Sequence, residues 1–157
     1  MTIIGIDPGP TQSAVVQVEF DPFRVSLATI GPNEEMRVWL QTRHHEDTAV
    51  VACEMLQSYG LAVGRECFET VYWVGRFAEC VPAHIRWKRY ARPTIKAHVC
   101  DGVRRPKDPD VRQALILRFG GTRKGQPLYG VVKDMWAALA VAVACHDGAE
   151  EWEWKLV

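Results

Sequence analysis

The chain begins with an apolar segment that ends in a single acid. Ile3, Ile4 and Ile6 precede Asp7, and a Pro-Gly pair follows directly. An isoleucine-rich run bounded by turn residues is typical of a buried strand, which would place Asp7 at the end of the first strand, at or near the core of a sheet. A carboxylate there is costly unless a cation or hydrogen bonds compensate it. The alternative is that Asp7 caps the turn, which is an ordinary role for Asp.

Length and composition favour a single globular domain over residues 1–157. The chain is long enough for a sizeable core, and 48% of its residues are hydrophobic, which argues against disorder. The 19 basic and 19 acidic residues balance, so the net charge does not indicate a partner. We find no apolar run of the roughly 18 residues that cross a bilayer and no secretion signal. Five widely spaced cysteines without a CxxC pair suit reduced thiols in the cytoplasm.

The order of the predicted elements is typical of an α/β protein with a mixed sheet. Apolar and β-branched runs predict strands over 3–6, 14–19, 25–30, 48–55 and 81–86. Helical spacing of apolar residues predicts helices over 34–43, 60–77, 111–119 and 133–146. In the helix over 111–119, Asp110 is the expected N-cap. Residues 94–100 are helix or loop, and the tail over 150–157 is a strand or a docking segment.

The region from residue 84 to 107 is strongly basic. It carries eight Lys and Arg residues against one acid, Asp101, with Trp87 and Tyr90 between them. Cations interleaved with aromatic residues suit phosphate contacts and base stacking, whereas the alternative is an ordinary solvated surface. We predict that the DNA-binding cations are Arg86, Lys88, Arg89, Lys96, Arg104, Arg105, Lys107 and Arg112.

Three acids share an unusual apolar setting. Asp7 ends the first strand, Glu54 ends the strand over 48–55, and Asp134 begins the apolar helix over 133–146, where the alternative role is helix capping. Neighbouring strands lie about 4.8 Å apart, so carboxylates at their ends can converge, and they repel one another unless cations sit between them. Oxygen ligands suit Mg²⁺ or Mn²⁺. Two such ions about 3.5–4 Å apart can carry an in-line displacement at phosphorus.

Four segments resemble, in the same order, those of RuvC-like Holliday junction resolvases, and most closely the small phage-encoded members. They are IIGIDPGPTQS, VVACEM, KAHVCDGVRRPKDPDVRQALI and KDMWAALAVAV. The resemblance implies a ribonuclease H-like fold, with a mixed five-stranded sheet flanked by helices. It also implies a homodimer that hydrolyses phosphodiester bonds of branched DNA with Mg²⁺ or Mn²⁺, with two ions per site. A phage-encoded protein would act in the cytoplasm of its bacterial host.

The resemblance also assigns roles to individual residues. It implies that Asp7, Glu54 and Asp134 are the catalytic metal ligands, and that Lys96 and Lys107 are the two lysines near the scissile phosphate, with Lys107 catalytic. The second lysine requires a one-residue insertion in the comparison.

Two positions depart from the family pattern. Ala137 stands where these enzymes usually carry a second acid on the last helix, and Gln57 stands where some carry an aromatic residue that probes the junction centre. Three acids are candidates to replace the missing one: Asp101, Asp108 and Asp147. Of these, Asp147 follows Asp134 by 13 residues, about 19 Å along a helix, so we expect it not to share the site.

Two other functions were weighed against a nuclease. The absent acid at Ala137 favours a non-catalytic module that binds branched DNA on the same scaffold. An actin-like ATPase also has an Asp-Gly turn after its first strand, but it needs two large lobes, and the sequence contains no GxxxxGK[ST] loop. We therefore expect no nucleotide cofactor and no membrane partner.

Overall fold

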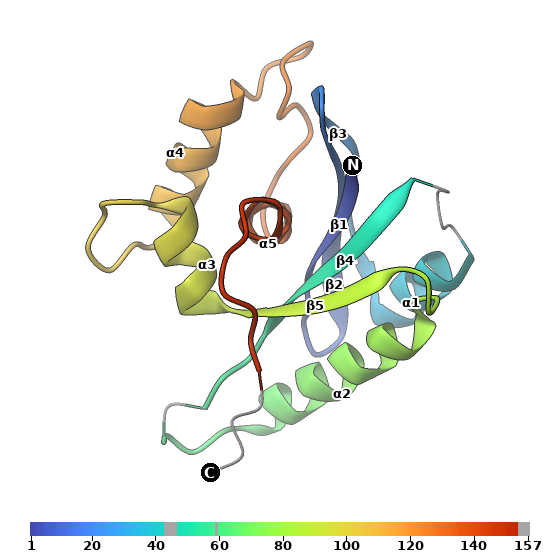
Figure 1. Cartoon of the computed structure of the whole chain (residues 1–157). Coiled ribbons are helices and arrows are strands. Elements are labelled where there is room, and N and C mark those ends of the chain that lie inside the picture. The colour runs from blue at the N-terminus through green and yellow to red at the C-terminus, as the bar shows by residue number, and fades with distance from the viewer. Residues whose placement is uncertain (43–46, 59, 154–157) are drawn as a thin grey trace.

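The computed structural model describes residues 1–42, 47–58 and 60–153, so the predicted helix over 34–43 and the predicted tail over 150–157 extend in part beyond the described residues. In the described part of the chain, five strands form one sheet in the order β3-β2-β1-β4-β5 (Figure 1). The strands are β1 (Thr2–Asp7), β2 (Gln12–Phe20), β3 (Phe23–Pro32), β4 (Thr48–Met55) and β5 (Arg86–Ala91). The first three pair antiparallel, whereas β4 and β5 run parallel to β1. The predicted mixed five-stranded sheet is confirmed.

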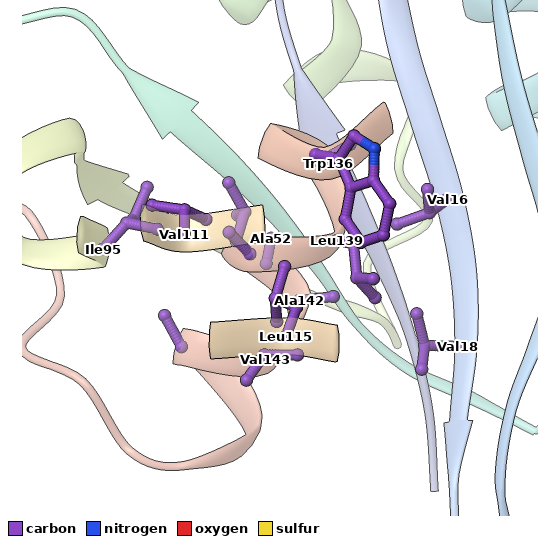
Figure 2. Packing of buried hydrophobic residues seen from close by; sticks show 14 of the residues in the cluster. Val16, Val18, Ala52, Ile95, Val111, Leu115, Trp136, Leu139, Ala142 and Val143 are labelled. Carbon is purple, nitrogen blue, oxygen red and sulfur yellow. The ribbon is translucent and has the colours of Figure 1, made fainter. Parts of the chain in front are cut away.

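Helices cover both faces of the sheet. They are α1 (Asn33–Thr42), α2 (Arg65–Cys80), α3 (Arg92–Val99), α4 (Asp108–Phe119) and α5 (Met135–His146). Figure 1 shows α1 and α2 on one face and α5 on the other, with α3 and α4 beside α5. Figure 2 shows Leu139 and Ala142 of α5 packed with Val18 of β2 and Leu115 of α4 in the core on the α5 face. A second core lies beneath α1 and α2 and includes Phe77.

Helix α5 passes very close to β1 at Gly5. A β-carbon on Gly5 would lie 2.1 Å from the carbonyl oxygen of Ala138 and 3.0 Å from the β-carbon of Ala142, so a larger residue requires the helix to shift. The backbone N–H of Ala138 donates to the carbonyl oxygen of Asp134 at 3.1 Å. The close approach therefore brings the first turn of α5, and Asp134 with it, towards Asp7 at the end of β1.

Replacing Gly5 with Ala is expected to destabilise the protein by about 1–3 kcal/mol, because an added methyl group in a well-packed interior forces the backbone to move. Gly75 is the matched control, since a β-carbon there meets no atom within 4 Å. Gly75 lies inside α2, so Gly75→Ala should instead stabilise the protein, by up to about 1 kcal/mol. Urea denaturation measures both values. Equal effects of the two changes would contradict the close approach of α5.

Element boundaries differ from the sequence-based prediction in several places. The helix predicted over 60–77 begins only at Arg65 and continues to Cys80. The strand predicted over 81–86 is wrong: the N–H of Ile85 donates to the carbonyl oxygen of Pro82 at 2.9 Å in a turn, and β5 begins only at Arg86. The prediction of Asp110 as N-cap is also wrong, because α4 begins earlier, with Lys107 as its N-cap. The carboxylate of Asp110 accepts the backbone N–H of Lys107 at 2.7 Å, so Asp110 stabilises the start of α4 from the third position of the helix instead of from the N-cap.

The C-terminal tail docks onto β5. The backbone N–H of Trp152 donates to the carbonyl oxygen of Arg89 at 2.7 Å, and the Arg89 guanidinium lies 4.9 Å from the centre of the Trp152 ring. Glu151 pairs with Lys88 at 3.2 Å. Over residues 150–153 the tail has no strand of its own, so the docking alternative holds for this part, while 154–157 lie outside the described residues. Within the described ranges, no helix combines the length and hydropathy needed to cross a bilayer.

Candidate active site

Alternation along the strands directs Asp7 and Glu54 to the same side of the sheet. In β4, Val51 and Cys53 belong to the core under α1 and α2, whereas Ala52 belongs to the core under α5. Successive side chains of a strand point to opposite faces, so Glu54 shares the α5 face with Ala52. By the same alternation Asp7 lies on the α5 face, and the parallel pairing of β1 with β4 sets the two carboxylates side by side at the sheet's edge.

The third acid reaches this edge from α5. Asp134 is the N-cap residue of the helix, and its side chain makes no capping hydrogen bond. Asp7, Glu54 and Asp134 all line one cavity of about 150 Å³ at the N-terminal end of α5. The other residues that line it are Arg92, Ile95, Lys96, Asp108, Val111, Lys133, Trp136, Ala137 and Ala140. Four carboxylates and three cationic side chains therefore meet in a small space with apolar walls.

Burial and mutual repulsion shift the proton affinities of the buried acids. Burial raises the pKa of Asp7 from 3.8 to about 7, and the neighbouring carboxylate of Glu54 adds to the rise, whereas the charge of Arg92 opposes it. Burial also raises the pKa of Glu54, and again Arg92 opposes the shift. Additional positive charge close to either carboxyl group would lower its pKa and favour the ionised form.

Ion pairs already engage two of the four acids. The Arg92 guanidinium bridges Glu54 and Asp108, with Nη1 3.1 Å from Glu54 Oε1 and Nη2 3.0 Å from Asp108 Oδ1. Lys96 Nζ approaches the same Asp108 oxygen at 2.7 Å. The hydrogen bond from Lys96, with the charge of Arg92, lowers the pKa of Asp108. Asp108 is thereby neutralised by two cations, while Asp7 has no ion pair within the described residues.

The donor chemistry of the cavity fits a hard divalent cation. All four acidic ligand candidates offer carboxylate oxygens, which Mg²⁺ and Mn²⁺ prefer, and burial, with the nearby Glu54 carboxylate, raises the pKa of Asp7. Among the described residues, however, no group of three or more His, Cys, Asp or Glu side chains is arranged to hold a metal ion. The bridge from Arg92 to Glu54 and Asp108 occupies carboxylate oxygens that an ion would need.

Of the acids considered as replacements for the fourth ligand, the structure brings only Asp108 to the cavity. Asp147 caps the far end of α5 and is paired with Arg118. Asp101 lies in the exposed turn after α3 and does not line the cavity. Ala137 does line the cavity, so a methyl group stands where the family pattern has a carboxylate.

The predicted DNA-binding cations do not form one uniform surface. Lys88 and Arg89 are engaged by the tail, and the Arg112 guanidinium lies 5.3 Å from the centre of the Trp136 ring. The remaining five divide as follows. Lys96 lines the acidic cavity and, with Arg105, a second cavity of about 440 Å³ next to it. The exposed members that line neither cavity are Arg86, Arg104 and Lys107.

Sequence reasoning missed two cations of the cavity. Arg92 was counted in the basic region without a role, yet it directly follows β5 and reaches Glu54 on the neighbouring strand. Lys133 lines the cavity beside Asp134, and its φ of 49° lies in the left-handed region that non-glycine residues rarely adopt. A correct placement of β5 would have revealed Arg92, because the ends of parallel strands meet at one edge. For Lys133 the only signal is its position next to Asp134.

Comparisons with known proteins support the fold. No protein-family model matches the sequence, and no curated protein matches it. Among solved structures, the chain is similar to Thermus thermophilus RuvC in complex with a Holliday junction substrate, with a TM-score of 0.60, 18% identity and coverage of 97% of this chain and 99% of that chain. A second Thermus thermophilus RuvC structure gives a TM-score of 0.61, 19% identity and coverage of 97% and 100%. The chain has a RuvC-like, ribonuclease H-like fold, as the resemblance implied.

Proposed function

We propose that the protein is a divalent-metal-dependent endonuclease that nicks branched DNA, such as Holliday junctions, by hydrolysing phosphodiester bonds. The observation that carries the proposal is the meeting of Asp7, Glu54 and Asp134, which are far apart in sequence, in one cavity. The RuvC-like fold supports it, since one of the similar structures is RuvC in complex with a Holliday junction substrate.

The proposed chemistry assigns a task to each group in the cavity. Asp7, Glu54 and Asp134 would hold Mg²⁺ or Mn²⁺, and we expect two ions per site. Bound ions of this kind supply an activated water and stabilise the charge on the leaving oxygen. Lys133 and Lys96 stand at the same cavity and would position the scissile phosphate. We retain Lys107 as a catalytic candidate because it precedes Asp108, although its own side chain does not line the cavity.

A homodimer is the proposed assembly, because two nicks in a two-fold symmetric junction require two sites related by the same symmetry. The aromatic residues of α2 divide between two environments. Phe77 is fully buried and Trp73 packs against the core, whereas Phe68 is 66% exposed and Tyr72 is also exposed. We propose that the face of α2 with Phe68 and Tyr72 contacts the second copy.

Replacing Phe68 with Asp is expected to convert the dimer to a monomer, because a charge in a desolvated apolar contact is costly. Analytical ultracentrifugation of the variant measures the change. Leu117→Asp is the matched control, since Leu117 is also a largely exposed apolar residue but lies on α4. A dimer that survives Phe68→Asp, or one that Leu117→Asp also disrupts, would contradict the proposed face.

The nuclease proposal is tested by incubating the protein with a four-way junction, a replication fork, a flap and a linear duplex in Mg²⁺ or Mn²⁺. We expect nicks in branched substrates and none in the duplex, and we expect Glu54→Gln to remove the activity. If no branched substrate is nicked, or if Glu54→Gln cuts as well as the wild type, the proposal fails.

The second candidate is a non-catalytic module that binds branched DNA. Ala137 and the ion pair between Arg92 and Glu54 favour it, since both reduce the number of free carboxylates. This alternative expects tight junction binding without cleavage in any metal, and hardly any Mg²⁺ binding in calorimetry. Cleavage of the four-way junction and calorimetric titration with Mg²⁺ therefore distinguish the two candidate functions.

A further inference from the structure

Arg92 lies among the acids of the cavity as a built-in cation. It is the first residue of α3, and its side chain, 45% exposed, reaches from the surface to the buried Glu54 and to Asp108. We propose that Arg92 is a movable counter-ion: it holds Glu54 while the site lacks metal, and it turns to a backbone phosphate of the bound DNA in the second cavity when Glu54 becomes a metal ligand. This inference rests on the proposed nuclease function and goes beyond it by naming the residue that links metal binding to DNA contact.

The ion pair and a metal ion compete for the same carboxylate. Arg92 Nη1 lies 3.1 Å from Glu54 Oε1, which is hydrogen-bonding distance. A divalent ion bound to that oxygen would lie next to the positive guanidinium, and like charges so close repel strongly in a partly buried site. Glu54 can therefore serve as a ligand only after Arg92 has moved away from it.

The second cavity provides an alternative position for the Arg92 side chain. Arg92, Glu54 and Lys96 line both the acidic cavity and the second cavity of about 440 Å³, so the Arg92 side chain forms part of the wall between them. Glu54 is the only acid among the described residues that line the second cavity, and Arg105 adds a further positive charge there. A phosphate of the DNA backbone suits this cavity, and the forked guanidinium matches phosphate oxygens well.

Asp108 can keep its hydrogen bond to Arg92 while the guanidinium turns away from Glu54. The other guanidinium nitrogen, Nη2, lies 3.0 Å from Asp108 Oδ1, on the rim of the acidic cavity. Release of Glu54 therefore requires the loss of only one of the two hydrogen bonds of Arg92. Lys96 stays with Asp108 at 2.7 Å and keeps that carboxylate neutralised in either position of Arg92.

The test compares Arg92→Gln and Arg92→Lys with the wild type in two measurements. The first is a calorimetric titration of the DNA-free protein with Mn²⁺, and the second is single-turnover cleavage of a four-way junction at saturating Mn²⁺. The control is Arg24→Gln, which removes an Arg–Glu pair of 2.7 Å between Arg24 and Glu19. That pair lies towards the other end of α5, where Phe20 stacks on His146 at 4.0 Å.

We expect Arg92→Gln to bind Mn²⁺ about tenfold more tightly, because loss of a charged hydrogen bond to Glu54 removes a competitor worth roughly that factor. We expect its cleavage to be about a hundredfold slower, because a small displacement of the DNA at the site can cost roughly that factor. Arg92→Lys keeps the charge without the fork and should give intermediate values in both measurements. Arg24→Gln should match the wild type in both.

Unchanged or weaker Mn²⁺ binding by Arg92→Gln would overturn the role of Arg92 as a counter-ion. Tighter binding with a wild-type cleavage rate would overturn its contact with the phosphate. If the Gln variant does not fold, as circular dichroism would show, the Lys variant decides both points. The Mn²⁺ titration uses no DNA, so failure of the nuclease proposal would appear separately, as a wild-type protein that binds Mn²⁺ and cuts no branched substrate.

Discussion

Asp7→Asn is expected to slow the cleavage of branched DNA on the order of a thousandfold. Asp7 lines the cavity together with Glu54 and Asp134, and the amide that replaces its carboxylate carries no charge to hold a divalent ion. Single-turnover cleavage of a four-way junction measures the loss. Asp47→Asn is the matched control, because Asp47 is exposed and precedes β4, at the other end of that strand from Glu54. A variant at Asp7 that cleaves at even a tenth of the wild-type rate would contradict the assigned role.

The same substitution should stabilise the metal-free protein. The pKa of Asp7 is raised from 3.8 to about 7 in the folded state, chiefly by burial. The folded state therefore binds the proton more tightly than the unfolded state, and stability falls as the pH rises from about 4 to 7. A shift of this size corresponds to a loss of at most about 4 kcal/mol of unfolding free energy. The loss is complete above pH 7, where Asp7 is ionised.

Thermal unfolding in EDTA at several pH values tests this. We expect Asp7→Asn to be more stable than the wild type at pH 8 and the difference to shrink as the pH falls to 5, because the wild-type carboxyl group then takes up its proton. Added Mn²⁺ should stabilise the wild type and leave the variant almost unchanged. A variant that is less stable than the wild type at pH 8 would show that Asp7 is compensated in the fold, as the turn-capping alternative requires.

Leu115→Ala is expected to cost about 3 kcal/mol of unfolding free energy, within the usual range of about 2–5 kcal/mol for a buried leucine. Leu115 of α4 is 0% exposed and packs with α5 and β2 in the core on the α5 face (Figure 2). Truncation removes apolar burial and leaves a cavity between α4 and α5. For a protein of this length the melting temperature should fall by about 6–12 °C.

Leu117 provides an internal control for this prediction. It lies two residues further along α4 but is 78% exposed, so Leu117→Ala should change the unfolding free energy by less than about 0.5 kcal/mol. Guanidinium denaturation of both variants gives the comparison. Similar losses for the two would show that α4 is not docked as described, and would also remove the support that places Asp108 at the cavity.

The sheet and the three central acids could be predicted because the local signals agree with the final packing. In β1 and β4 the apolar runs are continuous, as expected for strands buried on both faces, and each has a carboxylate at its end. The apolar sequence of α5 likewise predicted a buried helix. What the sequence left open was whether Asp7 and Asp134 serve a site or a cap. In the structure, the Asp134 side chain makes no capping hydrogen bond.

The edge strand β5 was misplaced for a physical reason. Its sequence, RWKRYA, alternates cations with aromatic residues instead of forming an apolar run, since an edge strand carries charge and needs less apolar surface. The apolar residues around Ile85 just before it predict a strand, although Pro82 begins a turn there. This error of about one strand length separated Arg92 from the strand end, and so concealed its closeness to Glu54.

The interaction partners of the basic residues could not be predicted from the local sequence. Lys88 and Arg89 are matched by Glu151 and Trp152, which are more than sixty residues away in the chain. Pairings over such distances depend on the path of the tail, for which the local pattern left two alternatives. The replacement of the fourth acid was equally hidden, because Asp108 reaches the cavity only through the docking of α4 beside α3.

The docked tail limits how two copies of this chain can meet. Strand β5 stands at the border of the sheet, and Trp152 already binds the main-chain oxygen of Arg89 there. If a second copy paired with β5 to extend the sheet, the tail would first have to dissociate from β5, and the ring of Trp152 would become exposed. Strand-to-strand self-assembly, the usual hazard of an open border, is thus discouraged on this side, and contacts through helices are left as the easier route to a symmetric pair.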